Sequence, residues 1–507
     1  MSSKSFLIMV VLCFFVFSAC SKNDDTSFAY VSERTKLPFA VSEDFLLLLD
    51  DAFNRRADII RPTLEVLYPL IETRNTMYAV TLRDKPAAHM PSTHKIHQNF
   101  AHDDVVTLFI ALAQHYGPYF YLGGDDVFLP VRDDILALID GQDAWRIADL
   151  EQLLHTHLSS IITDNHFHIN GMFLRCNTEF FQYHGAFERN DHGFRCMQSG
   201  RYVKTLLLPC RPDLHLDLHE TFRFSADERG EHFFYAPVIM MSIADGETIP
   251  ASLTIVYEDN TTQTVALAQL PKQRNDMIQS WSPNHSLEYV QGIPVVAIEG
   301  MGSSHTPNGR GRSEGRSFLR NANLYLQDEP VIILDLRGNG GGCGSLPTRW
   351  MYNVTGQLVP SNRIQLHART YQNIDDVERT HIHPLIPFGD HHVLVDSGPD
   401  RIVPNNQLII VLIDRFTASA GESMTDLAFN MENTLVIGQN TSGVLLTRSS
   451  ASNFLPWSNI PVAFNSWLAI HPEGHFAEGI GYAPDIWVMG DALTATLNML
   501  NHHIIQK

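Results

Sequence analysis

The chain has 507 residues, too many for one ordinary hydrophobic core, so we expect two or three domains. Apolar residues make up 44% of the sequence and charged residues 18%, a balance that excludes an intrinsically disordered protein. The formal net charge of −20 argues against a nucleic-acid partner and against a surface that binds anionic lipids.

The N-terminus has the pattern of an export signal. Lys4 precedes the apolar run 6–19, which is too short to span a bilayer, and Cys20 follows two small residues. This order resembles a bacterial lipobox, so residues 1–20 are predicted to be a lipoprotein signal peptide with lipidation at Cys20. The polar stretch after Cys20 resembles an export tag of Gram-negative surface lipoproteins. We therefore expect a lipid anchor in the outer membrane, on its periplasmic or outer side, and the alternative is a plain secretory signal.

The next two regions lead to the first histidine of interest. Residues 21–100 are predicted to be a spacer and an N-terminal region, with an amphipathic helix over 42–54. Residues 101–170 are predicted to be a helical domain, since acids that suit a helix start precede apolar positions at helical spacing. Its expected helices begin near Asp103 and span 133–139 and 147–162.

Alternating polar and apolar residues over 164–169 indicate that a strand ends the helical domain. His166 and His168 lie two residues apart on this stretch. The functional interpretation applies to His166, and His168 is expected to be structural.

Residues 171–290 form a β-rich insert, with a hairpin predicted from 251–257 and 262–267. His215 and His219 have the spacing of a metal pair on a helix, but alternating leucines between them favour a strand, so we expect no metal site. One disulfide among three nearby cysteines would suit an oxidising envelope, with the pairing left open: Cys176, Cys196 and Cys210.

Two apolar runs in the C-terminal half have the length and composition of buried parallel strands. The first, 330–336, leads into the glycine-rich sequence RGNGGG at 337–342, whose bare amides are able to act as donors. The second, 408–413, leads into TASAGE at 417–422 and a predicted helix start. Ser419 lies at this strand-to-helix junction between two alanines, which favours a nucleophile with an oxyanion-binding amide after it.

These stretches resemble the carboxy-terminal processing (tail-specific) serine peptidase family, which includes tricorn-type proteases. The matching blocks are DLRGNGGG at 335–342, TASAGE at 417–422 and EGIGYAPDI at 478–486, in family order. The resemblance implies a mixed α/β (α+β) fold with a ClpP/crotonase-like ββα-spiral catalytic core over residues 291–507. It also implies that 171–290 is a degenerate PDZ domain, although an unrelated β insert is equally open.

The resemblance assigns catalytic roles by position. Ser419 is the expected nucleophile, His166 the general base after a family-like L-x-x-x-I-x-D-x-H pattern, and Glu478 the carboxylate that orients it. Amides of Ala420 and of Gly340 or Gly341 would form the oxyanion hole. Asn165 takes the place of a serine that supports the glutamate in tricorn-type sequences, and His305, in a glycine-rich loop, is the reserve base.

The lysine content separates the two branches of the family. The tail-specific branch activates its serine with a lysine 25 residues downstream, where this chain has Val444, and no lysine occurs from Asn275 to Gln506. We therefore expect the tricorn-like Ser-His-Glu branch.

The sequence predicts a lipid-anchored serine endopeptidase that acts on protein or peptide substrates without a cofactor or metal. Its oligomeric state, cleavage specificity and membrane leaflet stay open. The alternative is a ligand- or protein-binding lipoprotein that has the peptidase scaffold without the activity. An α/β-hydrolase is disfavoured because no GxSxG surrounds Ser419.

Overall fold

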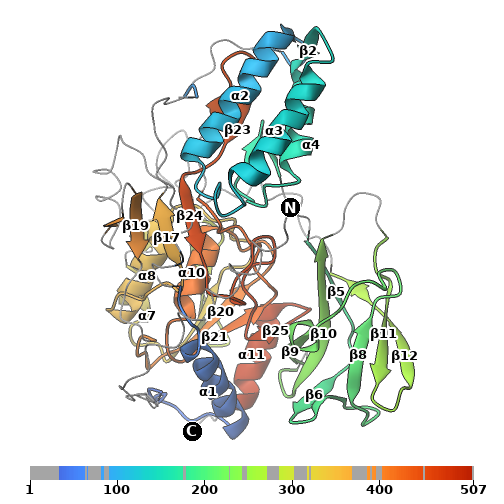
Figure 1. The fold of residues 1–507 in the computed structure, drawn as a ribbon. Helices are drawn as coiled ribbons and strands as arrows, with labels where there is room; N and C mark the ends of the chain where they lie inside the picture. Colours follow the sequence, from blue (N-terminus) through green and yellow to red (C-terminus); the bar gives the residue numbers. More distant parts are fainter. Residues whose placement is uncertain are drawn as a thin grey trace, which may run out of the picture. The chain divides into compact units, whose positions relative to one another are not determined.

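The computed structural model describes the following residues: 34–62, 66, 82–84, 91–174, 178–227, 229–242, 248–270, 285–301, 317–318, 321–367, 385–388, 391–395, 402–448 and 452–504. Residues Thr35–Lys507 form one compact unit by their internal contacts (Figure 1). Three positions singled out from the sequence lie outside the described residues: Cys20, Cys176 and His305.

The fold is mixed α/β, as predicted, and is built around a large sheet with a parallel centre. Neighbouring parallel strands are β15 (Ile293–Ile298), β16 (Val331–Asp335), β20 (Leu408–Ile413), β21 (Thr434–Gly438) and β25 (Ile486–Trp487). Antiparallel β14 (His285–Val290) forms one edge. Every residue of β20 and β21 is buried, which is typical of parallel strands that are covered on both faces.

Helices cover the two faces of the parallel strands (Figure 1). Met424 and Leu427 of α10 (Ala420–Ala428) pack on one face together with α7 (Ala322–Leu326) and α8 (Ser345–Thr355). The other face carries α1 (Glu43–Ala57) and α11 (Ala492–His503). Alternate side chains of β20 therefore belong to two separate apolar cores, one on each face of the sheet, as a strand buried on both faces requires.

Helix α1, near the N-terminus, is bonded to residues near the C-terminus. Arg56 of α1 is buried and forms an ion pair with Asp485, just before β25. The same carboxylate accepts the Val436 N–H of β21 at 2.8 Å. Ser42, the predicted start of this helix, hydrogen-bonds His503 of α11 at 2.7 Å.

The helical domain contains α2 (Gln98–His115), α3 (Asp125–Ile139) and α4 (Ile147–Leu158), beside the short pair β1 (Lys95–His97) and β2 (Ala144–Arg146). The predicted helix start near Asp103 is wrong, because α2 begins at Gln98. Asp104 is buried and accepts the N–H groups of Trp457 and Ser458 at 2.8 and 2.7 Å. This acid therefore binds a distant loop and does not cap the helix. Helix α3 also begins before the predicted 133, and α4 ends before 162.

The predicted strand over 164–169 is only partly present. Residues 165–166 form a turn, and β3 begins at His168 (His168–Ile169) and pairs with β4 (Met172–Phe173) and β23 (Pro461–Ala463). Strand β22 (Asn453–Phe454) continues this sheet. His166 is therefore a turn residue. His168 is half-buried, and burial lowers the pKa of its imidazole.

The 171–290 region is a sandwich of aromatic-rich strands. The large sheet continues from β25 through β9 (Phe222–Ala226) to β10 (Phe233–Ser242), β5 (Thr178–Gln182) and β13 (Ala268–Gln269), with β6 (Phe187–Asn190) and β7 (Gly193–Cys196) alongside. A second sheet contains β8 (Val203–Leu207) and the predicted hairpin, observed as β11 (Ser252–Tyr257) and β12 (Thr262–Ala266). Apolar side chains of both sheets share one core, and a PDZ domain is not confirmed.

The structure bears on two predictions for this region, the strand around His215 and the disulfide among the cysteines. The strand expected around His215 is wrong, because residues 214–217 are irregular and α5 (Leu218–Thr221) starts with Asp217 as its N-cap. Cys196 and Cys210 are not joined to each other, and their third candidate partner lies outside the described residues. In the described part of the chain, no group of three or more His, Cys, Asp or Glu residues is placed to hold a metal.

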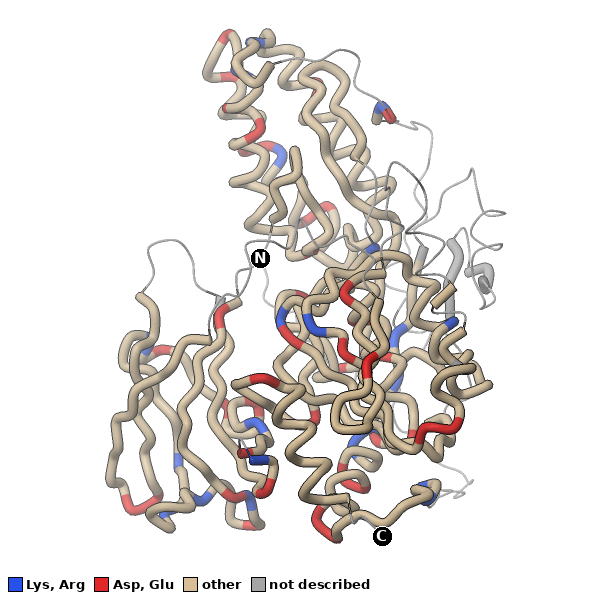
Figure 2. Tube along the Cα trace, turned by 180° about the vertical axis from the view of Figure 1, so that it is seen from behind, with Lys and Arg blue, Asp and Glu red and all other residues tan. Residues whose placement is uncertain are grey.

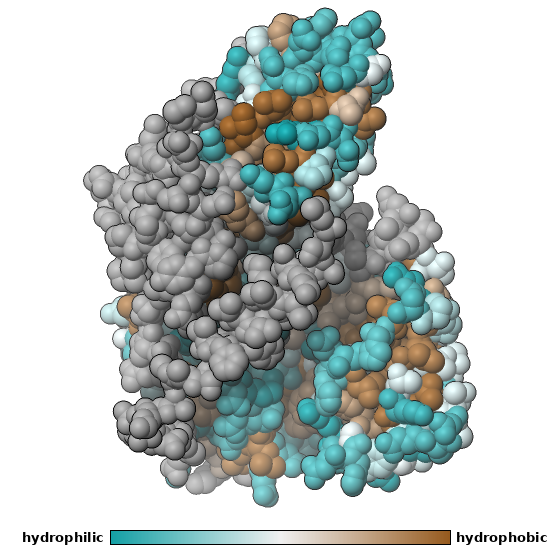
Figure 3. Space-filling view, in the orientation of Figure 1, coloured by the Kyte–Doolittle hydropathy of each residue, from teal (hydrophilic) through white to brown (hydrophobic). Residues whose placement is uncertain are grey.

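A four-stranded sheet completes the fold, in the order β18 (Leu385–Phe388), β19 (His391–Val395), β17 (Ile364–His367) and β24 (Trp467–Ile470). No helix among the described residues is long and apolar enough to cross a bilayer. Figure 2 shows acidic residues spread over the helical domain, the β sandwich and the region of the parallel strands, in keeping with the negative net charge. In Figure 3, exposed apolar side chains lie among polar ones on the β sandwich.

Candidate active site

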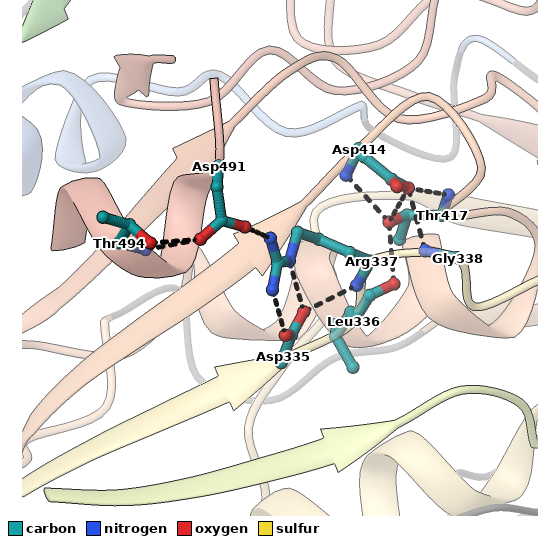
Figure 4. Close-up of polar contacts among 8 residues, drawn as sticks. All are labelled: Asp335, Leu336, Arg337, Gly338, Asp414, Thr417, Asp491 and Thr494. Atoms are coloured by element: carbon teal, nitrogen blue, oxygen red, sulfur yellow. Dashed lines mark hydrogen bonds and ion pairs between the residues drawn. The ribbon is translucent and has the colours of Figure 1, made fainter. Parts of the chain in front are cut away.

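The nucleophile turn, residues 414–419, joins β20 to α10. Asp414 Oδ1 accepts the N–H groups of Phe416 and Thr417 at 2.9 and 3.0 Å, which closes a tight turn directly after the strand. The Thr417 hydroxyl donates to the Leu336 carbonyl at 2.9 Å and so joins this turn to the end of β16 (Figure 4). These contacts place Ser419 at the first turn of α10.

Ser419 has an unusual backbone conformation. Its φ is 51° and its ψ −110°, a region that residues with a Cβ rarely adopt. The Ser419 N–H donates to Glu422 Oε2 at 2.9 Å, which offsets part of that strain. A strained serine between a strand and a helix presents its hydroxyl at the surface of the sheet, where a substrate carbonyl can reach it.

Glu422 holds the nucleophile turn against the 441–444 segment. Its buried carboxylate also accepts the Thr441 hydroxyl at 2.7 Å and the N–H groups of Gly443 and Val444 at 2.7 and 2.8 Å. Burial raises the pKa of this carboxyl, and the hydrogen bonds oppose that shift. Glu422 therefore acts as a capping and positioning group, in agreement with its place three residues after Ser419.

The glycine-rich loop lies directly against the nucleophile. Asn339 is buried, and its carbonyl accepts the Ala418 N–H at 2.8 Å. Gly341 has a φ of 99°, and a Cβ there would lie 2.7 Å from the Cβ of Ser419. Only glycine permits this approach.

The three N–H groups predicted to form the oxyanion hole differ in whether they are already hydrogen-bonded. The Gly341 N–H is already donated to Asn339 Oδ1 at 2.9 Å, so this amide does not suit the oxyanion hole. Gly340 lies in open space, because a Cβ there would meet nothing within 4 Å. Ala420 is the first residue of α10, where no helical carbonyl can accept its N–H. Of the predicted oxyanion-hole donors, the N–H groups of Gly340 and Ala420 therefore remain as candidates.

His166 lies next to Ser419 although 253 positions separate them in the sequence. Its Nε2 is 3.3 Å from the Ser419 hydroxyl oxygen, within hydrogen-bonding reach. The backbone N–H of His166 donates to Asp164 Oδ1 at 2.9 Å, and this contact fixes the turn that carries the imidazole. Both side chains are partly exposed.

Glu478 contacts the base turn through the main chain. Its Oε1 accepts the N–H of Asn165, the residue before His166, at 2.9 Å. Its Oε2 accepts the N–H groups of Leu445 and Leu446 at 3.0 and 2.8 Å. The support expected from the Asn165 side chain comes from its backbone instead, because its side-chain amide donates to the Gly443 carbonyl at 2.8 Å.

Asp164 was part of the predicted histidine pattern but had no assigned role. Its buried carboxylate accepts the Thr447 hydroxyl at 3.0 Å and the Tyr116 hydroxyl at 3.2 Å. Burial raises the pKa of Asp164 to about 6. Burial, followed by the nearby charge of Asp164, raises the pKa of Glu478 well above its usual value. The base turn thus rests on two neighbouring carboxyl groups.

Comparison with known proteins identifies the family of the catalytic region. The sequence profile of peptidase family S41 matches residues 293–488, a range that includes β16, β20, Ser419 and Glu478. Residues 293–488 belong to peptidase family S41. The chain is accordingly a serine-type peptidase, and the predicted family is confirmed, although the match does not distinguish the Ser-His-Glu from the Ser-Lys branch.

Solved structures of S41-type and other proteases show a distant likeness. The mature CPAF structure has a TM-score of 0.39 at 13% identity, with 80% of this chain and 98% of that chain covered. The photosystem II D1 C-terminal processing protease has a TM-score of 0.34 at 15% identity, with 76% and 93% covered. A putative peptidase from Parabacteroides merdae has a TM-score of 0.36 at 13% identity, with 76% and 89% covered. No curated protein matches the chain.

Proposed function

We propose that this S41 peptidase is an endopeptidase that uses Ser419, His166 and Glu478 in an acyl-enzyme mechanism. The observation that supports this proposal most strongly is the 3.3 Å distance from His166 Nε2 to the Ser419 hydroxyl. No lysine occurs between Asn275 and Gln506, which disfavours a Ser-Lys dyad built from the catalytic region.

In the proposed mechanism His166 takes the proton of Ser419 as the hydroxyl attacks the scissile carbonyl. The N–H groups of Gly340 and Ala420 stabilise the negative charge on the tetrahedral intermediate. The intermediate collapses to an acyl-enzyme while His166 gives the proton to the leaving amine. Water, deprotonated by His166, then hydrolyses the ester and regenerates Ser419.

Glu478 acts on the base through position and charge. It accepts the N–H of Asn165, so it fixes the residue that precedes His166. A negative charge at Glu478 would also stabilise the imidazolium that forms when His166 takes the proton. Its raised pKa implies that activity increases as pH rises and this carboxyl ionises.

Fluorophosphonate labelling tests the catalytic set. We expect the wild-type protein to label and to cleave casein, Ser419→Ala to do neither, and His166→Ala to label about 10³-fold more slowly. Normal labelling of His166→Ala would reject His166 as the base and make His305 the residue to test. A correctly folded wild type that does not label would contradict the whole proposal.

We further propose that the enzyme is anchored in the bacterial outer membrane by a lipid on Cys20. The support is the sequence order of an apolar run, small residues and a cysteine within residues 6–20. Radioactive palmitate should enter the wild-type protein and should not enter Cys20→Ala. Equal incorporation in both would contradict lipidation at this position.

A further inference from the structure

A cavity lies at the carboxyl ends of the parallel strands. Its volume is about 440 Å³, the size of a small-molecule site. Residues that directly follow or end four adjacent strands line it: Arg337 after β16, 414–416 after β20, 438–439 at β21 and 488–492 after β25. The crevice outside the carboxyl ends of parallel strands is where open α/β sheets bind their ligands. We call it the sheet-end cavity.

The sheet-end cavity shares Asp414 with the catalytic machinery. Asp414 lines the cavity, and its Oδ1 accepts the N–H groups of Gly338 and Thr417, both at 3.0 Å (Figure 4). The same oxygen also accepts the Phe416 N–H of the nucleophile turn. One carboxylate oxygen therefore holds together the start of the glycine-rich loop and the turn that leads to Ser419. A ligand that touches Asp414 touches the support of both.

Of the two arginines of the sheet-end cavity, Arg337 forms ion pairs with carboxylates and Arg415 contacts a carbonyl and an aromatic ring. Arg337 donates to both oxygens of Asp335 and to Asp491, and Asp491 in turn caps α11 by accepting the Thr494 N–H at 2.8 Å (Figure 4). Arg415 donates to the Thr178 carbonyl at 3.1 Å, and its guanidinium lies 5.3 Å from the ring centre of Phe180. Carboxylates thus engage the Arg337 guanidinium, whereas the Arg415 guanidinium is held by a carbonyl and an aromatic ring, and its buried Nη1 has no hydrogen-bond partner among the described residues.

Asp414 has an oxygen that remains available. Its Oδ2 accepts no hydrogen bond from the part of the chain that the structure describes, whereas Oδ1 accepts every hydrogen bond made to this side chain. With Asp335 included, three carboxylates and two guanidinium groups surround the cavity, a formal net charge of −1. Besides Gly438, Gln439 and Gly490, the rest of the lining consists of apolar residues: Ile413, Phe416, Val488, Met489 and Ala492.

We propose that the sheet-end cavity binds a primary ammonium group on a small apolar body, with the ammonium at Asp414 Oδ2. The amino terminus of a peptide with an apolar first residue presents this chemistry, and so does a free alkylamine. Because the ionised carboxylate is the better acceptor for the surrounding N–H groups, the ammonium also stabilises the nucleophile turn. This second effect rests on the proposed role of Ser419, whereas binding itself does not.

Binding is tested on the full-length Ser419→Ala protein by titration calorimetry with leucinamide. N-acetyl-leucinamide is the matched ligand without the charge, and hexylamine separates peptide amino termini from amines in general. We expect leucinamide to bind and its acetylated form to bind at least about tenfold more weakly. Absent binding, or equal affinity for the acetylated form, would overturn the proposal. If hexylamine binds, the ligands of the site include alkylamines. If hexylamine does not bind, the ligands are restricted to peptide amino termini.

The location is tested by filling the cavity. A Cβ at Gly490, on the cavity wall, would meet nothing within 4 Å, so a larger side chain can enter without displacing the fold. Gly490→Leu should weaken leucinamide binding at least about tenfold, and the matched Gly490→Ala should change it less than about twofold. Unchanged affinity in Gly490→Leu would place the ligand elsewhere and reject the site.

The link to the nucleophile is tested by labelling rate. Leucinamide should accelerate fluorophosphonate labelling of the wild-type protein about twofold or more, and should not affect labelling of Gly490→Leu. Slower labelling would indicate that the amine competes at Ser419 and would contradict the proposal. If no variant labels under any condition, the peptidase mechanism fails while the calorimetric result still decides whether the cavity binds ammonium groups.

Discussion

The nucleophile turn and the base turn are built in different ways. Ser419 is placed partly by neighbours in the sequence, since Asp414 and Glu422 both accept backbone N–H groups three residues away. It is placed partly by the strand end before the glycine-rich loop, through the bond from Thr417 to the Leu336 carbonyl. His166 is placed by distant residues, because Glu478 and Thr447 reach its turn across about 300 positions. The nucleophile turn therefore depends on short-range contacts and on the adjacent strand end, whereas the base turn depends more on residues far away in the sequence.

Blocking the close approach of Gly341 to Ser419 should cause the largest loss of activity. Gly341→Ala would force a Cβ to within 2.7 Å of the Ser419 Cβ and strain a positive φ. We expect kcat/KM for a peptide substrate to fall about 10³-fold, because small displacements of a nucleophile are costly. Gly344→Ala, two residues beyond the loop's last glycine, is the matched control, since its Cβ enters open space and its φ is −63°, and it should keep most of the activity. Similar losses in both variants would contradict this local explanation.

Neutralising the Glu478 carboxylate, which contacts the base turn from a distant part of the sequence, should cause the next largest loss of activity. Glu478→Gln retains a side chain of the same shape but loses the charge beside the base turn. We expect kcat to fall about 10²-fold with little change in KM. Glu473→Gln, at an exposed position on the same segment, is the control and should behave as wild type. A rise in KM at unchanged kcat would show that Glu478 serves substrate binding instead.

The buried Asp164 should make stability depend on pH. Its pKa is about 6 in the folded protein and near 3.8 when unfolded, so the folded state binds the proton more tightly. This contribution to stability is present below pH 3.8 and is lost as pH rises through 6. The free energy of unfolding should therefore decrease by up to about 3 kcal/mol between pH 4 and 7. Asp164→Asn should flatten that part of the profile in urea unfolding, and an unchanged slope would reject the assignment.

The smallest effect is expected at Asn165. Since its backbone N–H contacts Glu478, Asn165→Ala keeps that bond and loses only the side-chain bond to the Gly443 carbonyl. The free energy of unfolding should fall by about 1 kcal/mol, and kcat/KM should fall no more than a few-fold. A loss as large as that of Glu478→Gln would restore the side-chain role expected from the sequence.

The same contrast explains what the sequence could predict. Strand β20 was predicted with its observed bounds, and Ser419 was found from the small residues after it, because both signals are local. The approach of His166 required a family resemblance, since no spacing in the chain reveals a contact across 253 positions. Tyr116 and Thr447 were missed for the same reason. Their hydroxyl groups matter only because folding buries Asp164 between them.

The wrong helix start at α2 has a similar cause. Asp103 and Asp104 resemble first-turn acids, but Asp104 binds the N–H groups of a loop more than 350 residues away. A local pattern for capping was therefore satisfied by a tertiary contact. Predictions from sequence are weakest where an acid has a distant partner.

The pairing of α1 with the C-terminal residues has a consequence for synthesis and folding. Arg56 is translated 429 positions before its partner Asp485, and Ser42 461 positions before its partner His503 of α11. Helix α1 cannot dock until residues up to His503 have been translated, so the catalytic core stays incomplete, and therefore inactive, until α11 has been made.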